Sequence, residues 1–485
     1  MLLAWGTPPT TTIARLPSGL GLQNSTAPAA YRIGQDLERI EKQVREFTLD
    51  NGLKFIVRER HQAPIISFIT YVNVGGVDEP VGKTGVAHYL EHLAFKGTTR
   101  IGTKYYAAEK PLLIKLDRLF DRIKSVQTAG DGAKLAEIQE EFERVRWQAS
   151  SYVKQNEFGQ IIDRAGGVGL NATTSADATR YFFSLPSNKL ELWMSLESER
   201  FGDPVFREFF TEKEVILEER RLRTDNSALG KIIEAFQDSA FQEHPYGRPI
   251  IGYEEDIRNL TRQDVEEFFA TYYVPRNLTV AIVGDVELAE VKRLAQIYFG
   301  SYQDKPLPED QIPEEPPQTE AKEVTVEFPS QPWYLEGYHR PAMNHPDHVV
   351  YEMIGSILSD GRTSRLYKSL VEKQQVALGA AGESGFPGNK YPNLMLFYAV
   401  TAPGHTVEEV AAALQTEITG LKTEPVSQTE LDRVKTQARA GRLRAIGSNA
   451  GLASLLVEYE AKTGAWRNMF REIDLIAKVT AADIQ

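Results

Sequence analysis

The short stretch HYLEH, residues 88–92, places two of the chain's eight histidines four positions apart with a glutamate between them. A helical turn takes about 3.6 residues, so in a helix His88 and His92 project from one face and Glu91 lies beside them. Two neutral imidazoles can hold a divalent metal ion, and a carboxylate that does not bind the metal can accept a proton from water. The pattern H-x-x-E-H therefore predicts a metal site, with a structural histidine pair as the alternative.

The residues around the two histidines favour a helix. Apolar side chains recur at helical spacing between Val86 and Phe95. Thr84 is a suitable N-cap, and Gly97 stands where a glycine ends many helices. We therefore expect one helix to carry both histidines.

A metal site of this kind needs a third protein ligand, and a second predicted helix offers glutamates for it. The run EFFTEKEVILEERRLRTDN, residues 208–226, holds Glu212 and Glu219 two turns apart on one face, with Glu214 and Glu218 on other faces. Taken alone, such a run is more often a solvated acidic helix. The residue types by themselves leave the third ligand open.

The composition excludes several kinds of protein. The chain has 485 residues, of which 42% are hydrophobic and 25% charged, no cysteine and a net charge of −12. Without cysteine, disulfides and thiolate-bound zinc are excluded, so a metal would need histidine and carboxylate ligands. The negative charge argues against nucleic-acid binding, and no apolar run is long enough for a membrane span.

The order of the predicted elements indicates two similar halves. Strands are predicted within residues 44–73, 169–186 and 278–284. A helical hairpin is predicted within residues 104–157, because apolar residues that would form its seam recur three and four positions apart: Leu112, Leu116, Leu119, Ile123 and Val126, then Leu135, Ile138, Phe142 and Val145. The segment 303–320 is rich in proline and acidic residues, which is typical of a linker. After it, the strands EVTVEFPS and PWYLEGYHRPAM, the helix HPDHVVYEMIGSIL and the strand NLMLFYAVTAPG repeat the order of the first half.

These boundaries predict the domain organisation. We expect a flexible leader over residues 1–43, a catalytic first domain over 44–302 with the hairpin inserted, the linker, and a homologous second domain over 321–485 without a metal site. IDLIAKVTAADIQ near the end resembles DIRNLTRQDVE of the first half, but the chain stops soon after. We therefore expect the second domain to lack its last helix and strand.

The predicted fold class is α+β, with two homologous domains, each a mostly antiparallel sheet with helices packed on one face. The leader begins with MLLAWG, which has two interpretations. It is either the remainder of a secretory signal, which would favour the bacterial periplasm or cell envelope, or part of a plain unstructured extension, which leaves the cytoplasm open.

Five motifs together carry a resemblance to a known family. AHYLEHLAFKGT, EKEVILEE, NATTSADATRYFF, HPYGRPIIG and YYVPRNLTVAIVGD resemble, in their expected order, the motifs of the pitrilysin-type zinc peptidases. The chain is most similar to the shorter members, which include the mitochondrial processing peptidase beta subunit and many bacterial proteases.

The resemblance implies a role for each matching residue. His88, His92 and Glu219 would bind one zinc ion per chain. Glu91 would act as the general base, and Glu212 matches a glutamate that supports the site without binding the metal. The activity implied is that of a zinc metalloendopeptidase, which hydrolyses peptides or unfolded polypeptide segments inside a clamshell chamber.

Two further matches concern the ligand helix and the substrate. The pattern E-x-x-V-x-x-x-E aligns Glu219 with the family's third ligand, although its neighbour Glu218 competes for that role and would point about 100° away around the helix. Asn171 and Ala172 match a pair on an edge strand, where a substrate would add as an extra strand. The distance along the chain from His92 to the ligand helix exceeds the family's usual spacing, and the helical hairpin accounts for the excess.

The chain departs from the family at two positions in the second half. Relatives that work as homodimers carry R-E-K-x-G-L-x-Y there, whereas this chain has Val371 and Leu378 in place of the Arg and the Tyr. We therefore expect a heterodimer in which a homologous subunit without H-x-x-E-H supplies the missing pair. A non-catalytic structural subunit, and a peptide-binding clamp that holds zinc without turnover, are the alternatives.

Overall fold

The computed structural model of the chain describes residues 37–309 and 312–485. Most of the predicted leader, residues 1–36, and two residues of the predicted linker, 310–311, lie outside the described residues. The rest of the predicted leader, residues 37–43, is helical.

The larger sheet lies in the first half of the chain and contains six strands. They are β1 (Val44–Thr48), β2 (Lys54–Glu59), β3 (Ile65–Val72), β4 (Val168–Thr174), β5 (Thr179–Pro186) and β6 (Leu278–Gly284), hydrogen-bonded in the order β1-β2-β6-β3-β5-β4. All neighbouring strands are antiparallel except β2 and β6, which run parallel. The order leaves β4 at one edge of the sheet.

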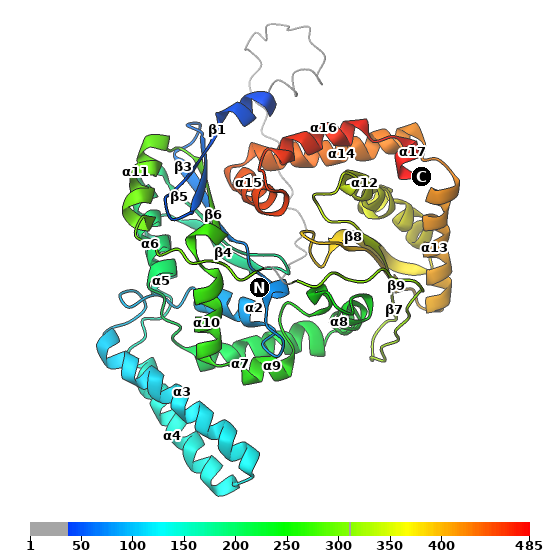
Figure 1. Cartoon of the computed structure of the whole chain (residues 1–485). Helices are drawn as coiled ribbons and strands as arrows, with labels where there is room; N and C mark the ends of the chain where they lie inside the picture. The colour runs from blue at the N-terminus through cyan, green and yellow to red at the C-terminus, as the bar shows by residue number, and fades with distance from the viewer. Residues whose placement is uncertain (1–36, 310–311) are drawn as a thin grey trace, which may run out of the picture. The chain divides into compact units, whose positions relative to one another are not determined.

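Helices cover both faces of this sheet, which explains why β6, LTVAIVG, is buried along nearly its whole length. Figure 1 shows α6 (Leu190–Gly202) and α11 (Leu288–Phe299) on one side of the strands and α15 (Asn449–Thr463) on the other. α15 packs against β3 and β6 although it belongs to the second half of the chain. The expectation of helices on one face therefore holds for the helices of the first half, and the second half supplies the other cover.

Polar contacts fix α15 and the turn that follows it to the first half. Lys462 lies 3.1 Å from the buried carboxylate of Asp177. The indole Nε1 of Trp466 donates to Glu46 in β1 at 3.0 Å. Apolar packing and these contacts together join the two halves.

The first half contains further helices between its strands. They are α2 (Val86–Leu93), α5 (Glu157–Arg164), α7 (Phe209–Arg220), α8 (Ala228–Ala240), α9 (Glu254–Asn259) and α10 (Arg262–Tyr272), with a π-helical turn at Arg221–Asp225 directly after α7. α2 packs against α7 and α10 and contacts β4 and β5.

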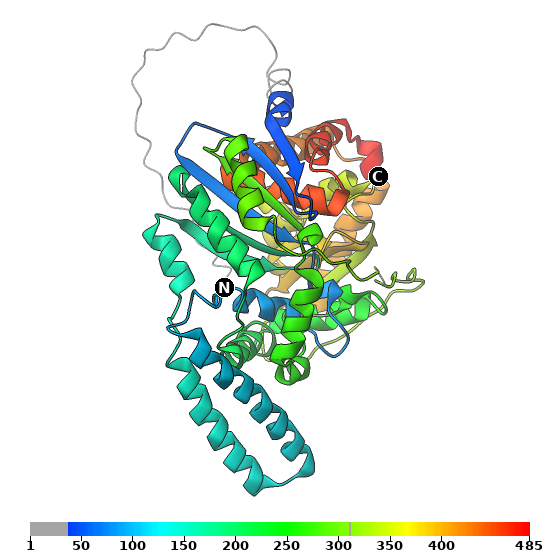
Figure 2. The same ribbon diagram turned by 60° about the vertical axis from the view of Figure 1, so that its left-hand side comes forward.

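The predicted helical hairpin is present. It consists of α3 (Tyr106–Ala129) and α4 (Gly132–Ser150), which run antiparallel and side by side (Figure 2). The apolar residues predicted to form the seam are mostly buried, including Leu116 and Ile123 from α3 and Phe142 and Val145 from α4. The spacing of three and four residues therefore identified the packed faces correctly.

A buried ion pair anchors the base of the hairpin. The side chains of Arg207 and Glu109 are both 0% exposed, and Nε of Arg207 donates to Glu109 at 2.9 Å. The same guanidinium donates to the carbonyl oxygens of Thr98 at 2.6 Å and Ile101 at 3.0 Å. Arg207 thus connects the hairpin to the loop that follows α2.

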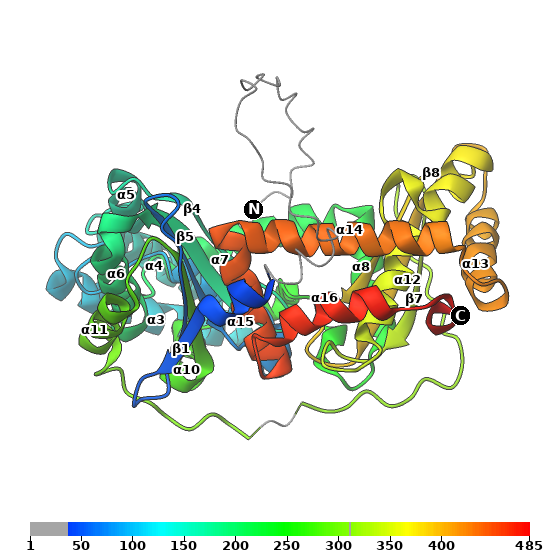
Figure 3. The ribbon, with the colours of Figure 1, turned by 90° about the horizontal axis from the view of Figure 1, so that it is seen from above.

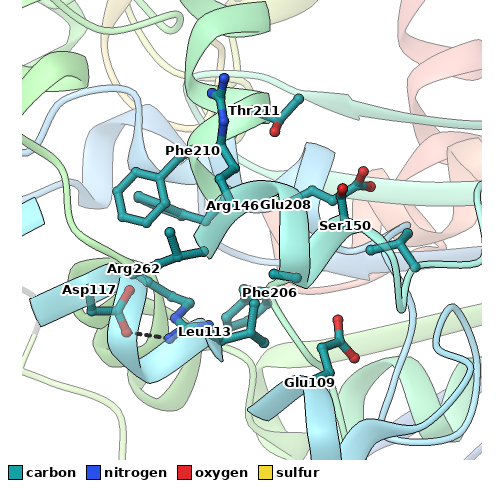
Figure 4. A pocket seen from close by; sticks show the side chains of 14 residues that line it. Glu109, Leu113, Asp117, Arg146, Ser150, Phe206, Glu208, Phe210, Thr211 and Arg262 are labelled. Atoms are coloured by element: carbon teal, nitrogen blue, oxygen red, sulfur yellow. Dashed lines mark hydrogen bonds and ion pairs between the residues drawn. The ribbon is translucent and has the colours of Figure 1, made fainter. Parts of the chain in front are cut away.

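Only a small cavity separates the base of the hairpin from α7 beside this ion pair (Figure 4). Its volume of about 30 Å³ is room for about one or two water molecules. Phe206, Phe210 and Leu113 line it, and Arg262 pairs with Asp117 at its wall. The hairpin is therefore packed onto the first half at its base.

The second half contains a smaller antiparallel sheet. Its strands are β7 (Trp333–Arg340), β8 (Ala377–Phe386) and β9 (Asn393–Thr401), in the order β7-β9-β8. Its helices are α12 (His348–Ser359), α13 (Val407–Thr423), α14 (Gln428–Gly447), α16 (Asn468–Lys478) and α17 (Ala481–Ile484). Figure 3 shows α14 and α16 lying side by side, and both contact α12, which packs on β8.

Three local predictions are wrong. EVTVEFPS, residues 323–330, is not a strand in the described part of the chain, because its alternating residues are mostly exposed and have no partner strand there. Thr84 does not cap the histidine helix, since the N-cap is Gly85 and the Thr84 hydroxyl donates to Asp256 instead. Gly97 lies beyond the helix, which ends at Leu93.

Among the described residues, no helix combines the length and the apolar character needed to cross a bilayer.

The Arg207–Glu109 pair gives a test of the hairpin's anchor. Arg207→Met should lower the free energy of unfolding by about 3–5 kcal/mol, because it leaves Glu109 as a buried, unpaired carboxylate. Adding Glu109→Leu should recover part of the loss. Urea unfolding followed by circular dichroism measures both, and a loss below about 1 kcal/mol for Arg207→Met would contradict this account.

Candidate metal centre

The histidine helix α2 has one buried and one accessible face. Its buried residues are Val86, Ala87, Tyr89, Leu90 and Leu93. His88, Glu91 and His92 share the other face and are partly exposed. Hydrophobic burial of one face therefore turns the three polar side chains together toward α7 and β4.

The buried side chain of Glu79 holds the start of α2. Gly85 occupies the N-cap with φ of 86°, and no side chain caps the helix there. The carboxylate of Glu79 instead accepts from the backbone N–H groups of Gly85 at 2.8 Å and Ala87 at 2.9 Å. These hydrogen bonds supply partners for N–H groups that the start of a helix leaves free. Burial raises the pKa of Glu79 to about 8, although both hydrogen bonds lower it.

Three side chains of α2 and α7 converge. His88 Nε2 lies 3.8 Å from Glu219 Oε2, and His92 Nε2 lies 3.6 Å from the same oxygen. One donor atom from each of these three residues lies within 4.8 Å of the other two. In the described residues this is the only cluster of three or more His, Asp or Glu side chains with such geometry.

The two distances to Glu219 are close to those expected around a tetrahedral zinc ion. With metal–ligand bonds of about 2.1 Å, two ligands at the tetrahedral angle lie about 3.4 Å apart, close to the separations of His88 and His92 from Glu219. Burial lowers the pKa of His88 to about 3, so its imidazole is neutral at pH 7 and has a lone pair to offer. Two imidazole nitrogens and a carboxylate oxygen are a ligand set that zinc accepts.

Glu212 orients one of the imidazoles. Its Oε2 lies 3.3 Å from Nδ1 of His92, which leaves Nε2 of that ring toward Glu219. Burial opposes ionisation of Glu212, but its hydrogen bonds with His92 and Lys96 outweigh burial, so the pKa of this carboxyl lies below its usual value. Lys96 also lies 3.3 Å from Glu208, and thus balances the charge of two carboxylates.

The structure distinguishes the two adjacent glutamates of α7. Glu219 turns Oε2 toward the histidines while Oε1 pairs with Arg223 at 2.8 Å. Glu218 lies on a different face, is half exposed and pairs with Arg221. Arg223 and Arg221 lie on the π-helical turn that follows α7.

The remaining carboxylate of the motif contacts the edge strand. Glu91 Oε2 accepts a hydrogen bond from Oγ1 of Thr174 at 2.6 Å. Burial raises the pKa of Glu91, while this hydrogen bond lowers it. Asn171 and Ala172 lie in the same strand β4, where they pair with Phe182 and Tyr181 of β5.

Four residues at this site were not identified from the sequence. Arg223 follows Glu219 by four positions, a spacing that could have indicated their ion pair. Lys96 contacts Glu212, which lies 116 positions further along the chain, so no local spacing indicates that pair. Thr174 lies within the NATT stretch, but only the paired strands bring it to Glu91. No local pattern connects Glu79 with the helix that it caps.

The second half carries a histidine helix without such a cluster. In α12, His348 and Glu352 lie where the repeat would place the motif, but the guanidinium of Arg340 contacts both, with Glu352 at 2.8 Å. A fixed cation between these groups disfavours a metal ion there.

The fold and this site define an α+β protein with two sheets, in which histidines of α2 and a glutamate of α7 form a cluster with the geometry of a metal site. The sequence pattern of insulinase (peptidase family M16) matches residues 54–109 and 142–254, and that of the peptidase M16 inactive domain matches residues 259–438. The chain belongs to peptidase family M16. The interruption between residues 109 and 142 falls within the hairpin of α3 and α4.

Relatives cover most of the chain. The zinc protease PqqE of Helicobacter pylori is 30% identical over 421 residues, which is 85% of this chain and 82% of that protein. A probable mitochondrial-processing peptidase subunit beta of Arabidopsis thaliana is 22% identical over 414 residues, 83% of this chain and 67% of that protein. The crystal structure of a protease from Helicobacter pylori superposes with a TM-score of 0.77 at 28% identity, covering 91% of this chain and 94% of the other.

The two glutamates give a matched test of the third ligand. Glu219→Gln should weaken zinc binding by more than the roughly 10- to 100-fold expected for Glu212→Gln, which removes only an orienting contact. Glu218→Gln should bind zinc like the parent, because that side chain points away. Competition against a chelator of known zinc affinity measures all three, and a loss in Glu218→Gln alone would move the ligand to that residue.

Proposed function

We propose that this chain is a zinc-dependent endopeptidase that cleaves peptides or unfolded polypeptide segments. One observation carries the proposal: the donor atoms of His88, His92 and Glu219 converge within 4.8 Å, and Glu91 on the same helix is hydrogen-bonded to the edge strand. A site for a metal, a proton acceptor and a surface for an extended peptide thus adjoin one another.

The side chains divide the work of hydrolysis. When bound, zinc supplies a Lewis acid that polarises a peptide carbonyl and makes water acidic enough to lose a proton near neutral pH. His88, His92 and Glu219 are the proposed ligands, and Glu212 orients His92. Glu91 is the carboxylate of the motif that is not a proposed ligand. It accepts the proton from water as a general base and donates it to the leaving amine.

An edge strand suits a peptide substrate of varied sequence. β4 pairs with β5 on one side only in the described sheet, so its other side offers backbone N–H and C=O groups. A peptide that adds there as a further strand is held through its main chain, with little demand on its side chains. Asn171 and Ala172 are the proposed contacts on this strand.

The second half motivates a proposed partner. Leu378, at the position of the family's Tyr, is 57% exposed on β8, and Val371, at the position of the Arg, packs partly buried against the second core. Neither side chain can donate hydrogen bonds to a substrate. We therefore propose a heterodimer with a homologous subunit that lacks H-x-x-E-H and supplies both groups. A non-catalytic subunit of the same fold remains the second candidate, favoured by these two replacements alone.

Glu91→Gln tests the catalytic assignment. The variant should keep its zinc, because Glu91 is not a proposed ligand, and lose peptide cleavage by about 10²- to 10⁴-fold, because the amide cannot accept the proton. Metal analysis and cleavage of a quenched fluorescent peptide library measure the two properties. Near-parental turnover in this variant would refute the proposed role.

The heterodimer is tested by mixing. The zinc-loaded chain should cleave the peptide library weakly alone and at least about tenfold faster after addition of a homologous subunit that carries the Arg and Tyr, since these groups would hold the substrate. The Glu91→Gln chain, mixed with the same subunit, is the control. Full activity of the chain alone would contradict the need for a partner, and inactivity in every mixture would favour the non-catalytic subunit.

A further inference from the structure

The hydrogen bond between Thr174 and Glu91 connects two parts of the site that the sequence presents separately. Oγ1 of Thr174 lies 2.6 Å from Glu91 Oε2, across 83 positions of the chain. Thr174 is the last residue of β4, and Glu91 lies in the second half of α2. The edge strand and the histidine helix therefore meet at this bond.

The bond leaves Glu91 with one held and one free oxygen. A glutamate side chain has three rotatable bonds and samples many orientations unless contacts select one. Thr174 contacts Oε2 only, and within the described residues Oε1 makes no hydrogen bond. The threonine hydroxyl thus fixes the carboxylate while leaving an oxygen available for a proton.

The position of Thr174 in β4 also connects its hydrogen bond with the pairing of that strand. Side chains alternate along a strand, so Thr174 and Ala172 lie on one face of β4, while Asn171 and Thr173 lie on the other. Residues 171–174 pair continuously with Phe182–Thr179 of β5, and the register is irregular only before Asn171. A peptide that pairs with the free side of β4 would order the same backbone that carries the Thr174 hydroxyl.

We propose that Thr174 is a positioning residue that orients Glu91, and that it makes turnover depend on peptide pairing along β4. This inference rests on the proposed peptidase function. It differs from a purely structural role, in which the hydroxyl only satisfies a nearby carboxylate and its loss would change stability alone.

The first test compares Thr174→Val, which removes the hydroxyl and keeps the shape, with Thr174→Ser, which keeps the hydroxyl. In the mixture of subunits that supports turnover, Thr174→Val should lower kcat by about tenfold or more with KM within about twofold, because a hydrogen bond to an ionised group is lost. Thr174→Ser should restore most of kcat. A valine variant with parental kcat, or a serine variant as slow as valine, would overturn the inference.

Two readouts do not depend on turnover. Thr174→Val should hold as much zinc as the parent, since the hydroxyl contacts no proposed ligand. Placed in the Glu91→Gln chain, it should bind a labelled substrate peptide with unchanged affinity in fluorescence anisotropy. Loss of zinc or of peptide affinity would show that the residue acts on the fold or on binding, which would overturn a positioning role.

A matched control exists in the same sheet. Thr70 on β3 donates to Glu197 on α6, also at 2.6 Å, in the buried interior. Thr70→Val removes an equivalent threonine–glutamate bond, so it should lower the melting temperature without lowering kcat. An equal fall in kcat for Thr70→Val and Thr174→Val would attribute both to general destabilisation and overturn the inference.

The dependence on strand pairing is tested with two peptides of one sequence, one of which carries backbone N-methyl groups upstream of the scissile bond. N-methylation removes donors that pair with β4, so it should lower kcat of the parent as well as raise KM. In Thr174→Val it should raise KM only, because the coupling is already lost. If N-methylation lowered kcat by the same factor in both proteins, the proposed coupling would be refuted.

Glu91→Gln separates this inference from the proposed function. If Glu91→Gln is inactive and Thr174→Val is fully active, only the role of Thr174 fails. If Glu91→Gln turns over like the parent, the proposed peptidase mechanism fails, and the inference about Thr174 fails with it.

Discussion

The separation between α2 and α7 is the constraint on which the site depends. A tetrahedral ion tolerates ligand distances that differ by only a few tenths of an ångström, and its proposed ligands come from two helices more than a hundred residues apart. The helices are held together where Phe209 packs against Tyr89 and its carbonyl accepts from the Tyr89 hydroxyl, and where His92 meets Glu212. Glu79 contributes by fixing the start of α2 through the backbone N–H groups of Gly85 and Ala87.

Charge balance around the two helices explains how so many carboxylates share one region. The charge of Glu212 is balanced by Lys96, which lies just beyond the end of α2, and that of Glu219 by Arg223, four positions further along the chain. The cations contact the oxygen that faces away from the histidine nitrogens. They therefore lower the cost of burying negative charge without competing for the atoms that would meet a metal ion.

Features that depend on the periodicity of the sequence could be predicted from it. Contacts between residues far apart along the chain could not. H-x-x-E-H and the seam of the helical hairpin follow from helical spacing, so both could be found locally. The choice between Glu218 and Glu219 depends on how α7 rotates when Ile216 is buried, which the residues alone left open. Thr174 reaches Glu91 only through the sheet, and EVTVEFPS has strand composition but no neighbouring strand in the described chain.

The packing of α15 shows which parts of the chain belong together in space, because this helix of the second half lies against β3 and β6 of the first half. Separating α15 from β3 and β6 would expose buried side chains of this helix such as Leu456 and Val457. Exposing one large apolar side chain costs about 1.5–3 kcal/mol of free energy. The division of the structure into two packed halves therefore does not coincide with the linker in the sequence. α15 follows α14 directly at Ser448, so the chain returns to the first sheet there, more than a hundred residues after the linker.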